Sequence, residues 1–470
     1  MASAPREIRD PIHVFVTVSK NERLVLDSRP FQRLRNIHQL AMTYLVYPGA
    51  SHKRFEHSLG VMHLAAVMFD VVTSRDKVTD RVREILPDEE DLPYWRSVLK
   101  IAALCHDMGH LPFSHAAEDE LLPMGTSHED MTRSIIDSEA MAQVWDAVEP
   151  HSVKKDHVIK LALGPKKAKG LVFSTWEEIL ADLITGDIFG ADRIDYLLRD
   201  SHHIGVAYGR FDHHRLIQTL KILPPAATPP NAEAAEEGKV VDTTETSALE
   251  LGVERGGLES AEALQLARYF MFSQVYLHPV RMIYDLHLKD FLVDWLTVDY
   301  DGTYPTDVDR FLNLTDNEVM AALLRAANDT TTAGHEAASR IINRQHFKVF
   351  YSRRPGDVAI FADSTRAIFQ AAEQEFGPEN VRYADGRKSG IPVTFTVQDR
   401  DGKPAASTAV SDAFERLLQP KDEFVYILPE LRKKAQKWVT KHGQDIIEAA
   451  KQNEQEEDIQ EEPEKEVVDP

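Results

Sequence analysis

Cysteine is almost absent from this chain of 470 residues, which has Cys105 and no other. A single thiol excludes an internal disulfide and any cysteine-rich metal knuckle, so a metal site must use histidine and carboxylate ligands. Apolar runs look far shorter than the ~20 residues of a membrane span, and the N-terminus "MASAPREIRD" has no apolar signal segment. We therefore expect no membrane association and no secretion, with a cytoplasmic location, or a nuclear one in a eukaryote.

Positive charge is also scarce. The chain has 54 lysines and arginines against 76 aspartates and glutamates, a formal net charge of −22. Extensive nucleic-acid binding is not expected, because a duplex demands a basic face. Part of the acidic excess lies in 451–470, with nine acids against two lysines, and such a block is typical of a solvated tail. We expect a disordered acidic tail over 441–470.

Most of the remaining sequence has helical periodicity. Alternation in 6–30 predicts a short strand pair and a turn, and Pro30 opens a helix. The proline-rich stretch 223–257 predicts an insertion followed by a hairpin, and a long helix beginning near Ser260 is expected to kink at Pro279. Helical spacing of apolar residues recurs in 56–75, 94–107, 128–147 and 176–199.

Residues 335–430 change character. Short alternating runs flank one helical segment there, which predicts a small α+β lobe. The expected fold is mainly α: a helical core with short N-terminal strands and a smaller α+β C-terminal lobe. The expected domains are 1–300, 301–440 and the tail 441–470.

Three histidines and an aspartate crowd into "CHDMGHLPFSH", residues 105–115. On a helix, His106 and His110 share a face and Asp107 is turned by about 100° from His106. Adjacent residues can still reach one ion where a helix ends. Imidazole with carboxylate suits Mn, Fe, Zn, Ni or Mg. Alone, an "HD" dipeptide is more often a hydrogen-bonded core histidine beside a surface aspartate, so the signal needs further ligands.

Two further motifs supply them. "GASHKRFEHSLGV" (49–61) offers His57, and "FGADRIDYLLRDSHHIG" (189–205) offers Asp192. The order His57, His106–Asp107, Asp192 resembles the HD superfamily of metal-dependent phosphohydrolases. Together with "PFQRLRNIHQL", these motifs resemble its deoxynucleoside triphosphate (dNTP) triphosphohydrolase branch over about residues 6–300, with no SAM domain expected ahead of them.

The resemblance implies a metal site and a proton-handling group. His57, His106, Asp107 and Asp192 would hold one divalent ion, and a further Mg²⁺ could arrive with the triphosphate. His110 or His115 would protonate the leaving 5′-oxygen or steady its charge, and Glu118, one helical turn after His115, could orient it. The residues implied around the scissile phosphate are His110, His115, Glu118 and His128. Relatives usually have aspartate where Glu118 stands.

The resemblance also implies substrate contacts. Arginines would bind the triphosphate, Asp200 and Gln39 would bind the 3′-hydroxyl, Tyr196 would crowd the 2′ position and Tyr276 would stack on the base. The implied substrate-binding residues are Gln39, Leu40, Arg54, Arg193, Tyr196, Asp200, Arg268 and Tyr276. Arg193 stands where relatives have lysine. Phe272 replaces a histidine of the human-type enzymes, so base preference is open.

"DSRPFQRLR" resembles the family's activator segment. Asp27, Gln32 and Arg35 would read a guanine nucleotide between subunits of a homo-oligomer, a dimer or tetramer, since aspartate and arginine complement the edges of guanine. A capped amphipathic helix would give the same pattern. Arg9 replaces an asparagine of the human-type site.

Three functions fit the sequence. The leading one is a dNTP triphosphohydrolase that releases deoxynucleoside and inorganic triphosphate, activated by a guanine nucleotide. A different HD phosphohydrolase, acting on nucleoside monophosphates, cyclic dinucleotides or (p)ppGpp, needs only the four metal ligands. A nucleotide-sensing assembly protein without turnover is the third, and an intact ligand set argues against it.

Overall fold

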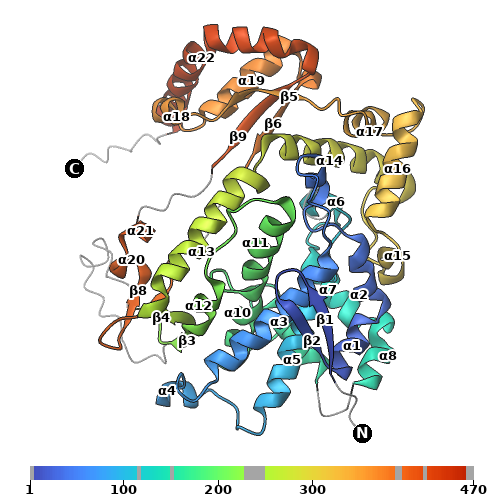
Figure 1. The fold of residues 1–470 in the computed structure, drawn as a ribbon. Helices are drawn as coiled ribbons and strands as arrows, with labels where there is room; N and C mark the ends of the chain where they lie inside the picture. Colours follow the sequence, from blue (N-terminus) through green and yellow to red (C-terminus); the bar gives the residue numbers. More distant parts are fainter. Residues whose placement is uncertain are drawn as a thin grey trace, which may run out of the picture. The chain divides into compact units, whose positions relative to one another are not determined.

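Helices make up most of the described chain, which confirms the mainly α fold (Figure 1). The computed structural model describes residues 5–113, 118–148, 153–226, 249–386, 394–415 and 421–461. Within these ranges the strands form three small sheets, with orders β1-β2, β3-β4-β7-β8 and β5-β9-β6.

The chain divides into two compact units. The first comprises Met1–Met271, Trp295–Ala322 and Gly390–Gln419, and the second comprises Phe272–Asp294, Leu323–Ser389 and Pro420–Pro470. The two units are defined by compactness. The predicted domains 1–300, 301–440 and 441–470 concern segments that would fold independently, so they stay predictions.

The first unit begins with the predicted strand pair. β1 (Arg6–Asp10) and β2 (Val14–Val18) are antiparallel, with Arg6 opposite Val18. Two short helices follow, α1 (Lys20–Leu26) and α2 (Arg29–Arg33). At the start of α1 the Glu22 carboxylate accepts from the Ser19 N–H, and at the start of α2 the Ser28 hydroxyl accepts from the Phe31 N–H. Pro30 stands within the first turn of α2.

The core of the first unit is built around α3 (Arg54–Val72), which packs against α5 (Leu92–Cys105) and α11 (Ala191–Ile204). By length and composition α3 could cross a membrane, contrary to our expectation that apolar runs are too short. However, 72% of its apolar window is buried inside the protein, as expected for the core helix of a helical fold. A side chain at Gly60 would meet Asp195 Oδ1 at 1.9 Å, so glycine allows α11 to lie close.

Shorter elements complete the first unit. Strand β4 pairs antiparallel with β3 and parallel with β7, so the second half of the predicted insertion enters a sheet, while 227–248 lie outside the described residues. The helices are α4 (Asp80–Arg83), α6 (Glu118–Leu121), α7 (His128–Asp137), α8 (Glu139–Ala147), α9 (Lys155–Leu163), α10 (Thr175–Thr185), α12 (His213–Gln218), α13 (Leu258–Met271), α15 (Val308–Leu312), α20 (Ser407–Val410) and α21 (Asp412–Glu415). The strands are β3 (Leu220–Leu223), β4 (Glu250–Glu254), β7 (Thr396–Gln398) and β8 (Pro404–Ala406).

The long helix predicted from Ser260 is interrupted near its proline. α13 ends at Met271, a π-helical turn covers Phe272–Tyr276, and α14 (Pro279–Asp299) begins at the proline itself. Proline suits the first turn of a helix because its missing N–H has no helical partner there.

The second unit confirms the predicted α+β lobe. β9 (Glu423–Ile427) lies between β5 (Lys348–Ser352) and β6 (Val381–Asp385), antiparallel to both. Its core joins Ile368 from one helix and Val439 from another to the sheet residues Val425 and Ile427. The helices are α17 (His335–Ile342), α18 (Pro355–Ile360), α19 (Ser364–Phe376) and α22 (Arg432–Glu461), with part of α14 and of α16 (Asp316–Asn328).

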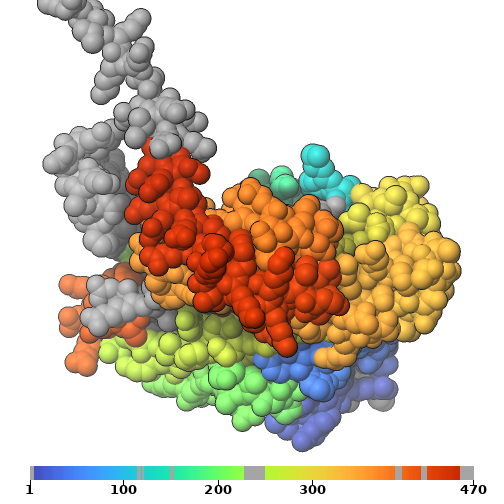
Figure 2. All heavy atoms as spheres, turned by 90° about the horizontal axis from the view of Figure 1, so that it is seen from above, coloured from blue at the N-terminus to red at the C-terminus, as the bar shows by residue number. Residues whose placement is uncertain are grey.

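α22 runs through the first part of the segment expected as a disordered tail. Ala435, Val439 and Ile447 on one face of the helix are buried in the core of the second unit, which explains why this segment is helical. Residues 462–470 lie outside the described residues. In the space-filling view α22 forms an open ridge (Figure 2).

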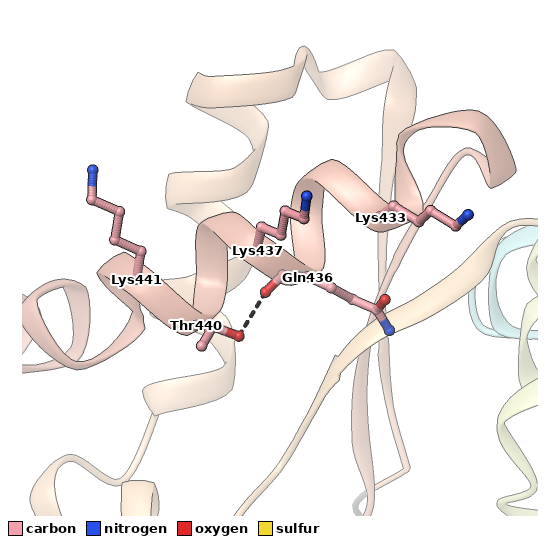
Figure 3. A pocket seen from close by; sticks show the side chains of 5 residues that line it. All are labelled: Lys433, Gln436, Lys437, Thr440 and Lys441. Atoms are coloured by element: carbon pink, nitrogen blue, oxygen red, sulfur yellow. Dashed lines mark hydrogen bonds between the residues drawn. The ribbon is translucent and has the colours of Figure 1, made fainter.

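A shallow cavity of about 420 Å³ lies on this ridge. Lys433, Lys437 and Lys441 project from it, and the Thr440 hydroxyl donates to the Gln436 carbonyl at 2.8 Å (Figure 3). The lining contains no carboxylate or imidazole, so this cavity lacks the ligands of a metal site like the one predicted.

Candidate metal centre and active site

Three of the predicted metal ligands converge at the end of α5. His57 comes from α3, His106 is the C-cap of α5 and Asp107 follows it; one ligand atom of each lies within 4.8 Å of the others. Asp192, in the first turn of α11, joins them, because its Oδ1 lies 3.0 Å from His57 Nε2 and 3.8 Å from His106 Nε2. The four residues that the resemblance implied as ligands are therefore brought together.

The donor set fits a divalent cation. His106 Nδ1 donates to the Ala103 carbonyl at 2.7 Å, which leaves the lone pair on Nε2. That Nε2 atom is buried and makes no hydrogen bond, although it faces Asp107 Oδ1 at 3.3 Å and Asp192 Oδ1 at 3.8 Å. A buried imidazole lone pair beside two carboxylates is a cation-binding arrangement.

The protein's own charges already favour ionised carboxylates here. Burial opposes ionisation, but His106 and Arg54 hold the pKa of Asp107 well below its ordinary value. His106 and His57 likewise lower the pKa of Asp192 against burial. Burial disfavours protonated His57, yet hydrogen bonds to Asp192 and Asp195 outweigh it and raise the pKa of His57 to about 10.

Asp195 is a functional residue that the motif reading missed. Its Oδ2 accepts from His57 Nδ1 at 2.8 Å and its Oδ1 lies 2.7 Å from His13 Nε2. Arg199, one turn later on α11, donates to both oxygens and reaches Asp10 at 3.0 Å. This buried network orients the ring of His57 and fixes its Nε2 toward the other ligands. The aspartate spacing of "DRIDYLLRD" was the only signal in the sequence.

Arg54, expected at the triphosphate, bonds Asp107 in this structure. Its Nη1 lies 2.5 Å from Asp107 Oδ2, and both side chains are buried. The guanidinium therefore lies beside the candidate metal ligands.

Beyond Asp107 lies a second cluster, His110, Glu118 and His128. The rings of His110 and His128 stack with centroids 4.1 Å apart, and His110 Nε2 is 3.2 Å from Asp107 Oδ1. Glu118 accepts from both the backbone N–H and Nδ1 of His128 at 2.8 and 2.5 Å. We expected Glu118 to orient His115, which lies outside the described residues; the structure places Glu118 on His128.

Packing explains why this cluster forms. A side chain at Gly109 would meet the His128 carbonyl oxygen at 2.1 Å, so glycine lets α7 cross directly over the "HDMGH" segment. Burial and the neighbouring Arg54 guanidinium hold the pKa of His110 well below its ordinary value. His110 is therefore a neutral imidazole at neutral pH.

Distant residues hold the same segment in place. Buried Arg33 donates to the His110 carbonyl at 2.8 Å and to the Leu314 carbonyl at 2.9 Å. Asp316 accepts from the Phe113 N–H at 2.6 Å, where Phe113 has the left-handed φ of 53° that non-glycine residues rarely adopt. No sequence motif indicated these contacts, because they join residues 77 to 281 positions apart in the chain.

Two of the predicted phosphate arginines meet at one loop. Arg193 donates to the Asp187 carboxylate at 2.8 Å, and Arg268 donates to the Asp187 carbonyl at 3.3 Å. Burial and the neighbouring Arg193 lower the pKa of Arg268. Burial raises the pKa of Tyr196, and the positive charges of Arg193 and Arg268 act in the opposite direction.

The predicted sugar contacts are divided between elements. Asp200 is buried on α11, where its Oδ1 lies 2.7 Å from His52 Nε2. Gln39 and Leu40 are half-buried in a turn before α3, and Gln39 Oε1 is buried without a hydrogen-bond partner. Tyr276 belongs to the second unit, where its ring lies 5.0 Å from that of Phe272.

Of the predicted activator residues, Asp27 lies at the end of α1, Gln32 lies on α2, and Arg35 lies in the 3₁₀ turn Leu34–Asn36 that follows α2. Gln32 Oε1 accepts from Arg35 Nε at 2.9 Å, and the Arg35 guanidinium lies 3.5 Å from the Phe55 ring centroid. Asp27, the C-cap of α1, has a largely exposed carboxylate 3.7 Å from Arg23. Phe55 stands between Arg54 and His57 on α3, so this surface contacts the helix that carries the site.

Comparison with known proteins agrees with the geometry. Residues 54–169 match the model of the HD domain and residues 236–379 match that of the HD associated region. The residues that gather at the site, His57, His106 and Asp107, lie within the part of the chain that matches the HD domain. HD domains bind a divalent metal, and the His57–His106–Asp107 cluster supplies such donors.

Individual proteins with similar sequences or structures are also known. An uncharacterized protein of Methanocaldococcus jannaschii is 34% identical over 282 residues, 60% of this chain and 48% of the relative. The deoxynucleoside triphosphate triphosphohydrolase SAMHD1 of Gallus gallus is 31% identical over 243 residues, 47% of this chain and 37% of the relative. This chain therefore spans half or less of these curated relatives. A hypothetical protein from Aquifex aeolicus has a similar crystal structure, with a TM-score of 0.71 and 29% identity over 92% of this chain and 99% of that one.

Proposed function

We propose that this protein is a metal-dependent dNTP triphosphohydrolase, which hydrolyses the bond between the 5′-oxygen and the α-phosphorus. The products are a deoxynucleoside and inorganic triphosphate. The observation that carries the proposal is the position of Asp107, whose Oδ1 lies 3.3 Å from His106 Nε2 and 3.2 Å from His110 Nε2. One carboxylate thus joins the candidate metal ligands to the candidate proton-handling groups.

His57, His106, Asp107 and Asp192 would hold the ion, which is Mn, Fe, Zn, Ni or Mg. When bound, a divalent ion polarises a phosphate oxygen and lowers the pKa of water. A further Mg²⁺ would accompany the triphosphate. Arg54 beside Asp107 would stabilise negative charge on the α-phosphate, because a guanidinium donates well to phosphate oxygens.

His110 and His128 would handle the proton of the leaving group. His110 is neutral at rest, and the approach of a tetra-anionic triphosphate favours its protonated form. Glu118 fixes the Nδ1–H tautomer of His128, so the Nε2 atom of His128 is the one open to proton exchange. His115 stays a candidate for the same role.

Arg193 and Arg268 would bind the remaining phosphates. Both guanidinium groups are partly buried around Asp187, and an incoming polyphosphate compensates the mutual repulsion that lowers the pKa of Arg268. Tyr196 would crowd the 2′ position, and Asp200 and Gln39 would bind the 3′-hydroxyl. Leu40 and Tyr276 stay predicted substrate contacts.

Regulation by a guanine nucleotide at Asp27, Gln32 and Arg35 belongs to the same proposal. The Arg35–Phe55 contact would couple a nucleotide at this surface to α3. The active form would be a dimer or tetramer in the cytoplasm, or in the nucleus of a eukaryotic cell. The relatives named as dNTP triphosphohydrolases support this proposal.

Product analysis tests the proposal. Purified protein is incubated with each dNTP, with Mn²⁺ or Mg²⁺ and with or without GTP, and products are separated by anion exchange. Deoxynucleoside with inorganic triphosphate is the expected result. Pyrophosphate or monophosphate release, or turnover of nucleoside monophosphates, cyclic dinucleotides or (p)ppGpp instead, would favour another HD phosphohydrolase. Nucleotide-dependent assembly without turnover would favour a sensor.

A further inference from the structure

His52 is a fully buried histidine that no motif assignment uses. Its ring stacks on that of His203 with centroids 4.4 Å apart and planes within 11°. His203 lies in turn 3.5 Å from Glu56 Oε2. The ring of His52 is therefore held on one face by α11, and it has a fixed direction.

That direction points to Asp200. His52 Nε2 lies 2.7 Å from Asp200 Oδ1, and the two side chains are 0% and 2% exposed. An ionised carboxylate only accepts, so Nε2 carries the hydrogen and donates it. Losing this donor would remove a hydrogen bond that fixes the buried Asp200 carboxylate, so the orientation of that carboxylate would change.

The backbone of His52 holds the other sugar-side group. The His52 carbonyl accepts from the Gln39 N–H at 3.1 Å, within a short pairing that also joins His38 to Lys53 and Ile37 to Arg54. The Gln39 side chain carries a buried Oε1 without a hydrogen-bond partner. A buried acceptor of this kind needs a donor, and a ligand hydroxyl can supply one.

We infer that His52 is the positioning residue for recognition of the sugar 3′-hydroxyl. Its ring fixes the Asp200 carboxylate and its carbonyl fixes the Gln39 turn, so one residue sets both groups that face this hydroxyl. The inference rests on the proposed function, because it takes a deoxynucleotide as the ligand. It predicts a defect that depends on the 3′-hydroxyl and not a general loss of activity.

The test compares each dNTP with its 2′,3′-dideoxynucleoside triphosphate, which lacks the 3′-hydroxyl. The ratio of kcat/KM for the two substrates is measured for the wild type, His52→Ala and His52→Gln. In the wild type we expect a preference of about tenfold or more for the dNTP, since one hydrogen bond in a buried site is at stake. His52→Ala should bring this ratio close to one, whereas His52→Gln, which keeps an N–H donor, should retain part of it.

His287→Ala is the matched control. His287 is equally buried but belongs to the second unit, where it accepts from the Phe347 N–H. Its loss lowers stability and should leave the dNTP to dideoxynucleotide ratio as in the wild type. Calorimetric binding of both nucleotides to protein without added metal gives a second readout, in which His52→Ala should weaken dNTP binding only.

The possible outcomes distinguish a failure of the proposed function from a failure of the inference about His52. If the wild type releases no triphosphate from any dNTP, the proposed function is wrong and the inference is lost with it. If the wild type turns over dNTPs but His52→Ala lowers both substrates equally, or if the wild type does not distinguish them, the inference alone is wrong. His52→Gln keeps the comparison possible where the alanine variant does not fold.

Discussion

Asp195 Oδ2 lies 2.8 Å from His57 Nδ1, and both side chains are buried. The same carboxylate also contacts the side chains of Arg199 and His13. Burial alone would raise the pKa of Asp195, but these partners hold it well below its ordinary value, so the carboxylate stays ionised. His57 is thereby fixed with Nδ1 toward Asp195 and Nε2 toward Asp192. A carboxylate behind a candidate metal histidine sets the ring orientation and raises its basicity.

Replacing Asp195 should weaken metal binding without removing a ligand. In Asp195→Asn the amide can present its NH₂ to His57, which would disturb the tautomer needed at Nε2. We expect metal affinity to fall roughly 10- to 100-fold. Titration with Mn²⁺, followed by calorimetry and by the metal dependence of turnover, measures this change. Unchanged affinity in a folded variant would show that the Asp195 network is only structural.

Removing a ligand should have a larger effect. The Asp192 side chain is 31% exposed, so Asp192→Ala should fold more readily than a variant of the buried Asp107, whose loss removes an ion pair with the buried Arg54. We expect loss of measurable triphosphate release together with loss of bound metal in elemental analysis. Asp309→Ala, at an exposed carboxylate paired with Arg29, is the control and should keep both. Full metal occupancy in Asp192→Ala would contradict the assignment.

The His128–Glu118 pair should act in the chemical step. We expect His128→Gln to lower kcat by about 10²- to 10⁴-fold with little change in KM, as for removal of a general acid. Glu118→Gln should have a smaller effect of the same kind, because the amide can still hold the ring. The double variant should be no worse than His128→Gln, since the two residues act as a unit. Additive losses would place Glu118 elsewhere, for example on His115.

The sequence alone was sufficient to predict the helical class and the α+β lobe. The resemblance of its motifs to a known family implied His57, His106, Asp107 and Asp192 as ligands, and the structure brings these four side chains together. The identity of Asp195 could not be predicted in this way, because Asp192, Asp195 and Asp200 all lie on α11. Which of them accepts from His57 Nδ1 depends on the close approach of α3 that Gly60 permits.

Contacts between residues far apart in the chain also could not be predicted from the sequence. Arg33 and Asp316 hold the segment 106–113 through bonds to backbone atoms, and backbone atoms leave no trace in residue types. Arg54 was expected to bind phosphate and pairs with Asp107 in the structure, since motif spacing cannot say which anion a guanidinium contacts. The first part of the acidic tail is helical because its apolar residues are spaced to lie on one face of a helix. The prediction of disorder considered the charges of this segment and not that spacing.

A last prediction concerns acid stability, and it involves the second unit. Burial, with Arg340 and Arg382 nearby, lowers the pKa of His287 from 6.5 to about 3, and neutral His287 accepts from the Phe347 N–H. Above the unfolded pKa both states are neutral and pH has no effect. As pH falls from 6.5 toward 3, the unfolded chain takes up a proton that the folded chain does not, so the free energy of unfolding decreases, by about 3 kcal/mol at about pH 4. His287→Gln keeps an acceptor without a titrating ring. Urea unfolding at about pH 7 and about pH 4 should therefore show a smaller loss for this variant than for the wild type, and equal losses would mean that His287 is not the titrating group.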